Sequence, residues 1–583
     1  MFTDLHVCVI KTEWCTITKV RFLFKREHML PQVPIGVSDF REIIETRDST
    51  GEPYLFVDKS LLIKDVIEDL TKVKLITRPR RFGKTLNMSM LHHFFAKTVH
   101  NKPTEHLFKG LKIAEYAECM KHQGQYPIIF LSLKDIKSAS FKSAYEDFCK
   151  LLSQAYEQHE HLLSDSKLTQ RQKNQYNGIL NRDAPESDIR SALKDLTFYL
   201  YQGYGVKPIV LIDEYDTPIQ TAYVKNYYEE MVTLMREFLG AGLKDNSHLD
   251  RAILTGVLRV SKESIFSGLN NIKTYSVLND RYGEYFGFVE DEVSRLLIKT
   301  ALDSHINDVK AWYNGYQIGD AIIYNPWSIV NYIQERGKLS SYWVNTSDNA
   351  LIKDLWVHSS ELFKGQFELL LKDEQIIMLM DEHLALNNLD KSEIAIWTLL
   401  AMSGYLKANF IKNGNNESLY YLKIPNKEVK DLYKRLIAEW LSGVNNAMVF
   451  NTFLNNLLNG EMKDFEDGLR RILLQTFSAH DIKGKNSEKF YHGFMLGLLS
   501  GIDQNHYKID SNKESGLGRY DIILIPNDTS KLGIILEIKS IDESSSKNLK
   551  EAANEAIKQI DEKQYHITLL QHSIGIIVIP ASS

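Results

Sequence analysis

The chain has few prolines, few cysteines and no long apolar run, and these absences argue against disordered, disulfide-rich and membrane-spanning proteins. Its 583 residues include only 13 prolines and no run of about 18 apolar residues, so neither a disordered chain nor a membrane span is expected. Its four cysteines have no paired metal spacing and are too sparse for a disulfide scaffold. We therefore expect a cytoplasmic protein without a membrane partner. The cysteines are Cys8, Cys15, Cys119 and Cys149.

An excess of positive charge is also missing. The formal net charge is −5, and residues 446–583 contain 15 Lys and Arg against 18 Asp and Glu. No broad basic surface indicates a nucleic-acid partner. DNA or RNA would have to bind in a local basic groove, or with help from another domain or protein.

The length predicts several domains, because one hydrophobic core does not serve so long a chain. Residues 1–28 mix apolar and charged side chains and lack the apolar core and cleavage site of a signal peptide. We treat them as an extension of doubtful origin and hypothesise that translation starts at Met29, which N-terminal mass spectrometry would test.

Residues 29–289 alternate short apolar runs with helical patterns, which predicts a parallel sheet flanked by helices. Residues 290–445 are mostly helical in pattern and predict a lid and connector, in which 394–406 and 418–424 favour a winged-helix-like unit. Aromatic residues there, such as Trp312 and Trp343, could stack bases, but packing within the lid is favoured. The predicted strands of the first part are Val73–Ile76, Tyr126–Leu133, Pro208–Ile212 and Ala252–Leu254.

A phosphate-binding loop is predicted directly after the first of these strands. The strand runs into Arg80-Arg81-Phe82-Gly83-Lys84-Thr85, and a helical pattern follows over 86–95, which is the context of a Walker A motif. The loop amides could hold phosphate oxygens, Lys84 could reach the β and γ phosphates, and the Thr85 hydroxyl could bind Mg²⁺.

One position departs from this motif. The first glycine of GxxxxGK[ST] would fall on Arg78, so the loop must make its turn in another way, for which Pro79 is one candidate. Arg78, Arg80 and Arg81 either contact phosphates or form a basic lip, and the sequence does not separate the two.

A second motif supports the first. Ile209–Ile212 is an apolar strand that ends in Asp213 and Glu214, as in a Walker B motif. Asp213 would help to hold Mg²⁺ at the carboxyl edge of the sheet, and Glu214 would act as general base on the attacking water. Further along, Thr255 is placed to sense the γ phosphate or to orient water. Arg259 could stabilise transition-state charge or form a structural salt bridge.

Several blocks of this region, in order, resemble the bacterial AAA-ATPase-like family over about residues 31–350. The resemblance implies a P-loop NTPase of α/β class that binds and hydrolyses ATP, and it implies that an arginine at position 78 is shared by the family. Because AAA-like sites often use an arginine from a neighbouring copy, a homo-oligomer stays open. The blocks are Pro34–Phe40, Phe56–Ser60, Arg78–Thr85, Asp213–Pro218, Thr255–Arg259, Phe266–Asn271 and Trp312–Tyr316.

Acidic residues and a lysine recur near the C-terminus in the predicted domain 446–583. Asp521 opens one predicted strand (520–525), and Glu537 and Lys539 close the next (532–538), on one face by the period of two. The carboxylates could bind Mg²⁺, and Glu488 of a predicted helix, 487–499, could complete the metal shell. Lys539 could orient an attacking water or help to deprotonate it. Gln559 and Lys563 share a face of the next predicted helix, 548–563, which precedes a last strand at 574–579.

This order of elements resembles the PD-(D/E)xK nuclease superfamily over about residues 485–580, a restriction-endonuclease-like α/β fold. The shared blocks are Glu488–Gly493, Arg519–Asp521, Glu537–Lys539 and Gln559-Ile560. The leading hypothesis is an ATPase that controls a Mg²⁺-dependent nuclease acting on DNA or RNA. The alternative is a signalling or scaffold ATPase whose C-terminal fold binds without cutting.

Overall fold

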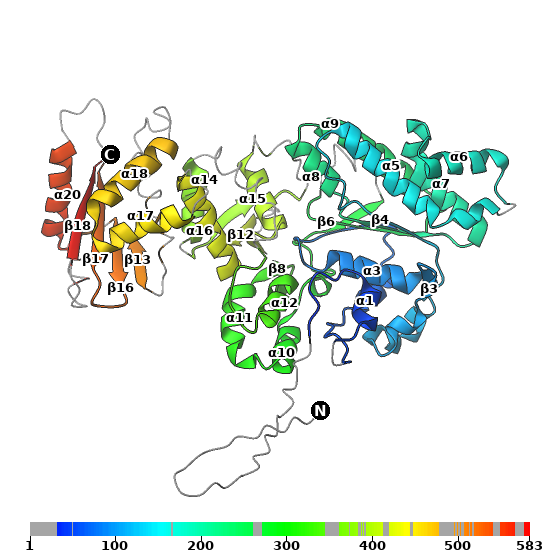
Figure 1. The fold of residues 1–583 in the computed structure, drawn as a ribbon, viewed down its shortest axis with the longest axis horizontal. Coiled ribbons are helices and arrows are strands. Elements are labelled where there is room, and N and C mark those ends of the chain that lie inside the picture. Colours follow the sequence, from blue (N-terminus) through cyan, green and yellow to red (C-terminus); the bar gives the residue numbers. More distant parts are fainter. Residues whose placement is uncertain are drawn as a thin grey trace, which may run out of the picture.

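The computed structural model describes residues 32–582 with short gaps. In Figure 1 a large α/β part formed by the first half of the chain is followed by smaller connector elements and then by a separate C-terminal sheet. None of the described helices is long and apolar enough to cross a membrane. The gaps are 49–50, 165–166, 260–270, 344–360, 372, 383–385, 387–388, 390–391, 412–418, 443–446, 477–494, 496–497, 500–501, 503–505, 512–513, 516–517, 520, 540–548, 566–568 and 570–575.

A five-stranded parallel sheet forms the centre of the first part, with the strand order β4-β5-β6-β1-β7. Four strands are those that the sequence predicts, and β7 is an addition at the edge beside β1. Every residue of β1, β5 and β6 is buried, as expected for strands covered on both faces. The strands are β1 (Val73–Thr77), β4 (Ile128–Ser132), β5 (Ile209–Asp213), β6 (Ala252–Gly256) and β7 (Ile272–Tyr275).

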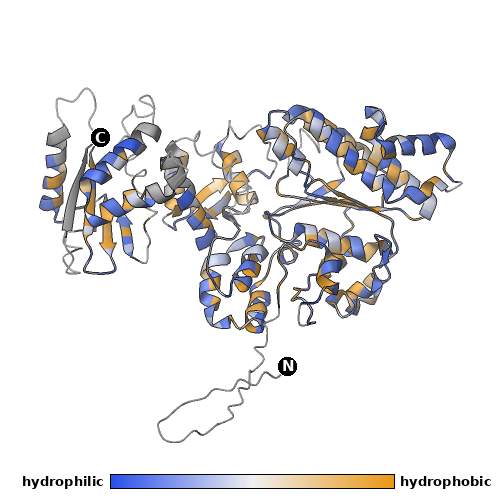
Figure 2. Cartoon of the chain, viewed as in Figure 1, coloured by the Kyte–Doolittle hydropathy of each residue, from blue (hydrophilic) through white to orange (hydrophobic). Residues whose placement is uncertain are grey.

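Helices cover both faces of this sheet (Figure 1). Because strand side chains alternate, Leu75 and Ile212 join the core under one helical layer, while Ile76 and Leu211 join the core on the other side. Figure 2 shows hydrophobic strands between helices whose outer faces are hydrophilic. One layer contains α1 (Phe40–Glu45), α2 (Leu61–Glu68), α3 (Lys84–Phe95) and α4 (Ala117–Met120). The other contains α5 (Phe141–Glu157), α6 (Gln170–Asn181), α7 (Glu186–Tyr204), α8 (Thr217–Val224) and α9 (Tyr228–Leu243).

The lid begins with three helices around a small hairpin. Buried side chains such as Val293, Val309 and Ile329 give these helices a core of their own. A further short hairpin, β2 (Thr98–Val99) with β3 (Lys102–Pro103), follows α3. The lid elements are α10 (Glu290–Lys299), α11 (Ile306–Tyr313), β8 (Tyr316–Ile318), β9 (Ala321–Ile323) and α12 (Pro326–Gln334).

The connector contains more sheet than the mostly helical prediction allowed. Its three strands pair antiparallel in the order β10-β12-β11. Helix α15 and the strands β11 and β12 that follow it occupy the region predicted to be winged-helix-like. Its core, including Trp343 and Trp397, is continuous with the core above the central sheet. The elements are α14 (Glu361–Leu371), β10 (Ile376–Leu379), α15 (Glu393–Met402), β11 (Lys407–Phe410), β12 (Leu419–Lys423) and α16 (Lys427–Ser442).

The C-terminal part is a four-stranded sheet with the order β13-β16-β17-β18, in which β17 and β18 are parallel and the other pairs antiparallel. Three strands and α20 correspond to predicted elements, whereas β13 was not predicted. The predicted helix 487–499 lies almost entirely outside the described residues. The elements are α17 (Ala447–Asn459), α18 (Met462–Thr476), β13 (Tyr507–Ser511), β14 (Glu514–Ser515), β15 (Gly518–Arg519), β16 (Ile522–Pro526), β17 (Gly533–Lys539), α20 (Leu549–Lys563) and β18 (Ile576–Ser582).

Candidate nucleotide-binding site and C-terminal acidic site

The loop between β1 and α3 turns without a glycine at position 78. Its left-handed residues are Arg81 (φ 66°) and Gly83 (φ 79°), and Gly83 is the N-cap of α3. Lys84 and Thr85 therefore begin the helix, whose first amides point into the loop. This places a helix N-terminus, which favours anions, at the carboxyl edge of the sheet.

Arg78 is a structural residue of this loop. Its guanidinium is fully buried and donates to the carbonyl oxygens of Thr77 at 2.8 Å, Tyr275 at 2.7 Å and Arg281 at 3.2 Å. The group also lies over the ring of Phe286, 5.3 Å from its centroid. Arg78 thus connects the loop to β7 and to the segment beyond it. Its side chain is neither a free phosphate contact nor part of a basic lip, the two roles that the sequence left open.

Lys84 is enclosed by the same loop. Its ammonium donates to the carbonyl oxygens of Arg78 at 3.1 Å and Pro79 at 3.0 Å. Burial lowers the pKa of Lys84, an effect that the nearby carboxylates of Glu214, Asp216 and Asp213 oppose. The lysine is therefore held inside the loop by neutral acceptors that an anion could replace.

Both carboxylate oxygens of Asp213 accept a hydrogen bond from a threonine hydroxyl. Thr85 donates to Oδ2 over 2.7 Å, and Thr255 donates to Oδ1 over 2.5 Å. The contact with Thr255 exists because β6 lies next to β5, so that both strands end at the same edge. Burial raises the pKa of Asp213, while the two hydroxyls oppose the shift. The structure thus brings three of the predicted site residues together.

Glu214 and Asp216 of the next turn both line the pocket described below, but their other contacts differ. Glu214 has a left-handed backbone (φ 53°), and its side chain lines the pocket described below. Asp216 is buried and accepts from the backbone amides of Val257 at 2.9 Å and Leu258 at 2.8 Å. Asp216 therefore fixes the end of β6 against the Walker B turn.

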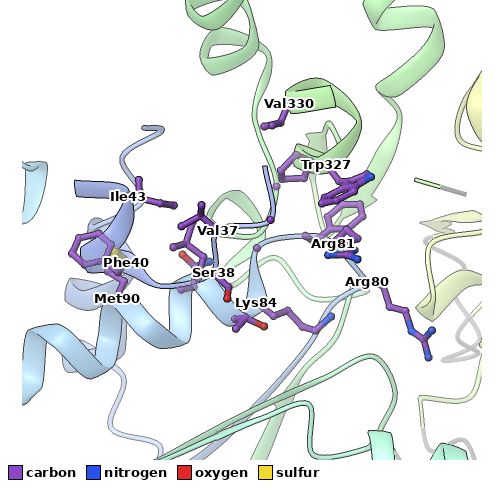
Figure 3. Close-up of a pocket in the computed structure, with 18 of the residues that line it drawn as sticks. Val37, Ser38, Phe40, Ile43, Arg80, Arg81, Lys84, Met90, Trp327 and Val330 are labelled. Carbon is purple, nitrogen blue, oxygen red and sulfur yellow. The ribbon is translucent and has the colours of Figure 1, made fainter. Parts of the chain in front are cut away.

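A pocket of about 520 Å³ lies in front of the loop (Figure 3). Its polar end contains Arg80, Lys84 and Glu214, and its apolar end contains Val37 and Val330. Figure 3 shows the side chains of Arg81 and Trp327 beside each other at the pocket. The guanidinium carbon of Arg81 is 4.3 Å from the ring centroid of Trp327. The pocket therefore combines cationic groups with an apolar surface, a combination suited to a nucleotide.

The C-terminal sheet holds two of the predicted acidic residues. Asp521 precedes β16 and accepts from the backbone amide of Ile538 at 2.8 Å, and Glu537 lies buried on β17. Gln559 of α20 donates to Oε1 of Glu537 over 2.5 Å. Within the described residues no group of three or more His, Cys, Asp or Glu could hold a metal ion. Glu488 and the side chain of Lys539 are outside the described set.

Comparisons with known proteins agree with this geometry. The model of a family described as "Predicted AAA-ATPase", AAA-ATPase-like, matches residues 34–266. The chain carries an AAA-ATPase-like domain. The PD-(D/E)XK nuclease superfamily matches residues 486–581, so a domain of this superfamily follows at the C-terminus. A protein of Azotobacter chroococcum mcd 1, described as "Uncharacterized protein in vnfD 5'region", is 26% identical over 477 residues, which are 80% of this chain and 82% of the relative.

Two residues predicted for the nucleotide site of the AAA-ATPase-like domain have side chains with other contacts. The ring of Phe82 is fully buried and packs edge-on against Tyr316, although Phe82 is among the residues that line the pocket. Arg259 is half-buried and does not line the pocket; burial lowers its pKa, and Tyr215, Glu382 and Asp381 oppose the shift. Arg259 thus faces the connector rather than the phosphate end.

The pocket walls include residues that the motifs did not predict as ligands. Residues 33–38 line one side and Pro326, Trp327 and Val330 of the lid line another. In the sequence, only the resemblance of the block Pro34–Phe40 to the AAA-ATPase-like family indicated that residues 33–38 could matter for the site. The AAA-ATPase-like domain therefore completes its pocket with a helix that lies outside the matched range.

Proposed function

We propose that the protein binds and hydrolyses ATP and that this ATPase acts together with a Mg²⁺-dependent phosphodiesterase domain on DNA or RNA. The observation that carries the ATPase half is the pair of hydrogen bonds that Thr85 and Thr255 donate to the two carboxylate oxygens of Asp213, beside Lys84. A buried carboxylate held by hydroxyls offers hard oxygen ligands, which fit Mg²⁺. When bound, Mg²⁺ would offset charge on the β and γ phosphates.

At the nucleotide, each residue has a distinct task. The amides that begin α3 and the ammonium of Lys84 hold phosphate oxygens, with Arg80 at the mouth of the pocket. Glu214, which lines the same pocket, takes a proton from the water that attacks the γ phosphate. The apolar end near Val37 and Val330 would exclude water from a bound nucleotide.

The C-terminal domain supplies the second reaction. Asp521 and Glu537 would hold a Mg²⁺ ion, and Gln559 keeps Glu537 in place through the 2.5 Å hydrogen bond. Lys539, two residues further along β17, would orient the attacking water. The ordered contacts of Asp521 and Glu537 support this half of the proposal, which also includes a cytoplasmic location and leaves a homo-oligomer open.

Variants of the nucleotide site test the ATPase half. We expect Lys84→Ala to abolish nucleotide binding and Glu214→Gln to bind ATP but release phosphate at least about 100-fold more slowly. Lys121→Ala, an exposed lysine paired with Glu118, is the control. If both site variants hydrolyse ATP at the wild-type rate, the assignment is wrong.

Nuclease assays separate the proposal from a binding-only C-terminal domain. With Mg²⁺ or Mn²⁺ the wild type should cleave DNA or RNA, and Lys539→Ala should lose cleavage but keep ATP hydrolysis. Lys531→Ala, in the exposed turn before β17, should retain both activities. Failure of the wild type on a broad panel of substrates, with and without ATP, would favour the binding module.

A further inference from the structure

Four consecutive residues of the phosphate loop are each held by the lid or the connector. The contacts come from separate segments, so the loop and the region beyond residue 290 form one packed unit. Pro79 lies so close to Gly404 that a Cβ built on the glycine would be 2.9 Å from Cβ of Pro79. The indole nitrogen of Trp343 donates to the carbonyl oxygen of Arg80 over 3.0 Å, and Trp327 lies under Arg81. Phe82 packs edge-on against Tyr316, with 5.0 Å between the ring centroids.

One buried carboxylate joins the two tryptophans. Glu428, fully buried at the start of α16, accepts from the backbone amide of Trp343 at 2.7 Å and from the hydroxyl of Ser328 at 2.8 Å. Ser328 follows Trp327 in α12, and the indole of Trp327 donates to the carbonyl oxygen of Tyr342 over 3.3 Å. Loss of this carboxylate would leave buried donors unsatisfied and release both tryptophans.

Helix α16 continues this contact toward the C-terminal domain. It packs against α17 and α18, and Figure 1 shows these helices between the connector and the C-terminal sheet. Leu457 of α17 and Phe465 of α18 share a core with Leu524 of β16 and Leu536 of β17. A shift of α16 would therefore press on the helices that cover the sheet holding Asp521 and Glu537.

Phosphate binding would disturb the start of this route. Lys84 donates to the carbonyl oxygens of Arg78 and Pro79, which are part of the loop itself. A phosphate group that takes over the ammonium would free the carbonyls of Arg78 and Pro79, and the loop would adjust there and at the neighbouring Arg80. Pro79 and Arg80 are both in contact with the connector, so the adjustment cannot be confined to the pocket.

We propose that helix α16 responds to the nucleotide at the phosphate loop through Trp343 and Trp327, and that Glu428 is the positioning residue that holds both tryptophans on the loop. The inference rests on the proposed nucleotide binding. It adds a mechanical link by which occupancy of the ATPase site changes the surroundings of the C-terminal acidic site.

The test is hydrogen exchange of the full chain with and without the magnesium complex of ATPγS. We expect the nucleotide to change amide exchange in residues 427–435 of the wild type at least about fivefold. Trp343→Phe keeps the aromatic ring but loses the N–H donor to Arg80, and Glu428→Ala loses the carboxylate. Both should bind the nucleotide within about threefold of wild type and lose the response of α16, while Glu428→Gln should recover part of it.

Lys430→Ala is the matched control, since Lys430 lies on the same helix and pairs with Asp373 away from the tryptophans. It should respond like the wild type. If Glu428→Ala does not fold, Trp343→Phe decides the question, because Trp343 does not line the nucleotide pocket. A response that survives in these variants, or wild type that binds without any change in α16, would overturn the inference alone. Wild type that binds no nucleotide would overturn the proposed function as well.

Discussion

The hydroxyl of Thr85 donates to Oδ2 of Asp213 over 2.7 Å and so joins the first turn of α3 to the end of β5. This contact connects two motifs that lie 128 residues apart in the chain. Thr255 holds the other oxygen from the neighbouring strand, so the carboxylate is fixed on both sides before any ligand arrives. Fixed ligands of this kind lose little freedom when a metal ion binds.

Thr255→Val tests the value of this second hydroxyl. The substitution keeps the shape of the side chain but leaves Oδ1 of the buried Asp213 without its donor, so we expect ATP turnover to fall about 10–100-fold with little change in metal-free nucleotide affinity. Phosphate release and calorimetry measure the two effects. Thr274→Val in the same sheet is the control, because its hydroxyl has no hydrogen-bond partner in the part of the chain that the structure describes. Equal losses in both variants would contradict the prediction.

Gly256→Ala should destabilise the ATPase-like domain by about 1–3 kcal/mol, because the new methyl group would overpack its surroundings. A Cβ at this position would lie 2.6 Å from Oδ1 of Asp216 and 2.7 Å from Cε1 of Tyr215. Urea unfolding measures the change. Gly240→Ala is the matched control in α9, where a Cβ meets nothing within 4 Å, and it should stabilise by up to about 1 kcal/mol.

Glu428 should make stability depend on pH. Burial raises the pKa of Glu428 to about 7, although hydrogen bonds from Trp343, Ser328 and Tyr342 and the charge of Arg435 oppose the shift. The folded chain thus binds this proton more tightly than the unfolded chain, whose glutamate pKa is about 4.3. The stabilisation is complete below about pH 4.3 and is lost as the pH rises through about 7.

Glu428→Gln lacks this proton and provides the comparison. The difference in unfolding free energy, wild type minus variant, should fall between about pH 4 and pH 7 with a steepest slope of about 1.4 kcal/mol per pH unit and level off above. Urea unfolding followed by tryptophan fluorescence at several pH values measures it. Parallel pH profiles for the two proteins would show that the buried carboxylate does not titrate in this range.

Gln559→Leu should weaken the C-terminal site. The substitution removes the amide that donates to Oε1 of Glu537. We therefore expect Mn²⁺ affinity and any nuclease activity to fall about 10–100-fold. Calorimetric titration with Mn²⁺ gives a readout that does not need cleavage. Lys558→Ala, on the exposed side of α20 and paired with Glu562, should bind Mn²⁺ like the wild type.

The sequence predicted the parts of the fold that follow from local pattern. β5 and β6 are uninterrupted apolar runs, and their ends placed Asp213 and Thr255 at one edge of the sheet. β7 was missed because two polar residues, Lys273 and Thr274, interrupt the short segment Ile272–Tyr275 at the sheet edge, where only Tyr275 is fully buried. The extra strand in turn determines the environment of Arg78, which no local pattern contains.

The rest of the site depends on distant contacts. The direction of Arg78 is decided by carbonyl oxygens of Tyr275 and Arg281, and the apolar end of the pocket by Trp327 and Val330 of the lid. Arg259 could be assigned equally to phosphate or to a structural role until the connector carboxylates were located beside it. A sequence shows which charges exist, but not which face of a loop they occupy.

Arg78 also sets an order of events during synthesis. Its acceptor on Tyr275 lies 197 residues further along the chain, and Arg281 lies beyond that. At roughly 5–20 residues per second a ribosome needs about 10–40 s to make this stretch. Until then the guanidinium of Arg78 lacks these two carbonyl partners, and the loop lacks the contacts that hold it in the folded chain. We therefore expect an N-terminal fragment that ends before β7 not to bind nucleotide, whereas a chain that includes this edge strand should bind it.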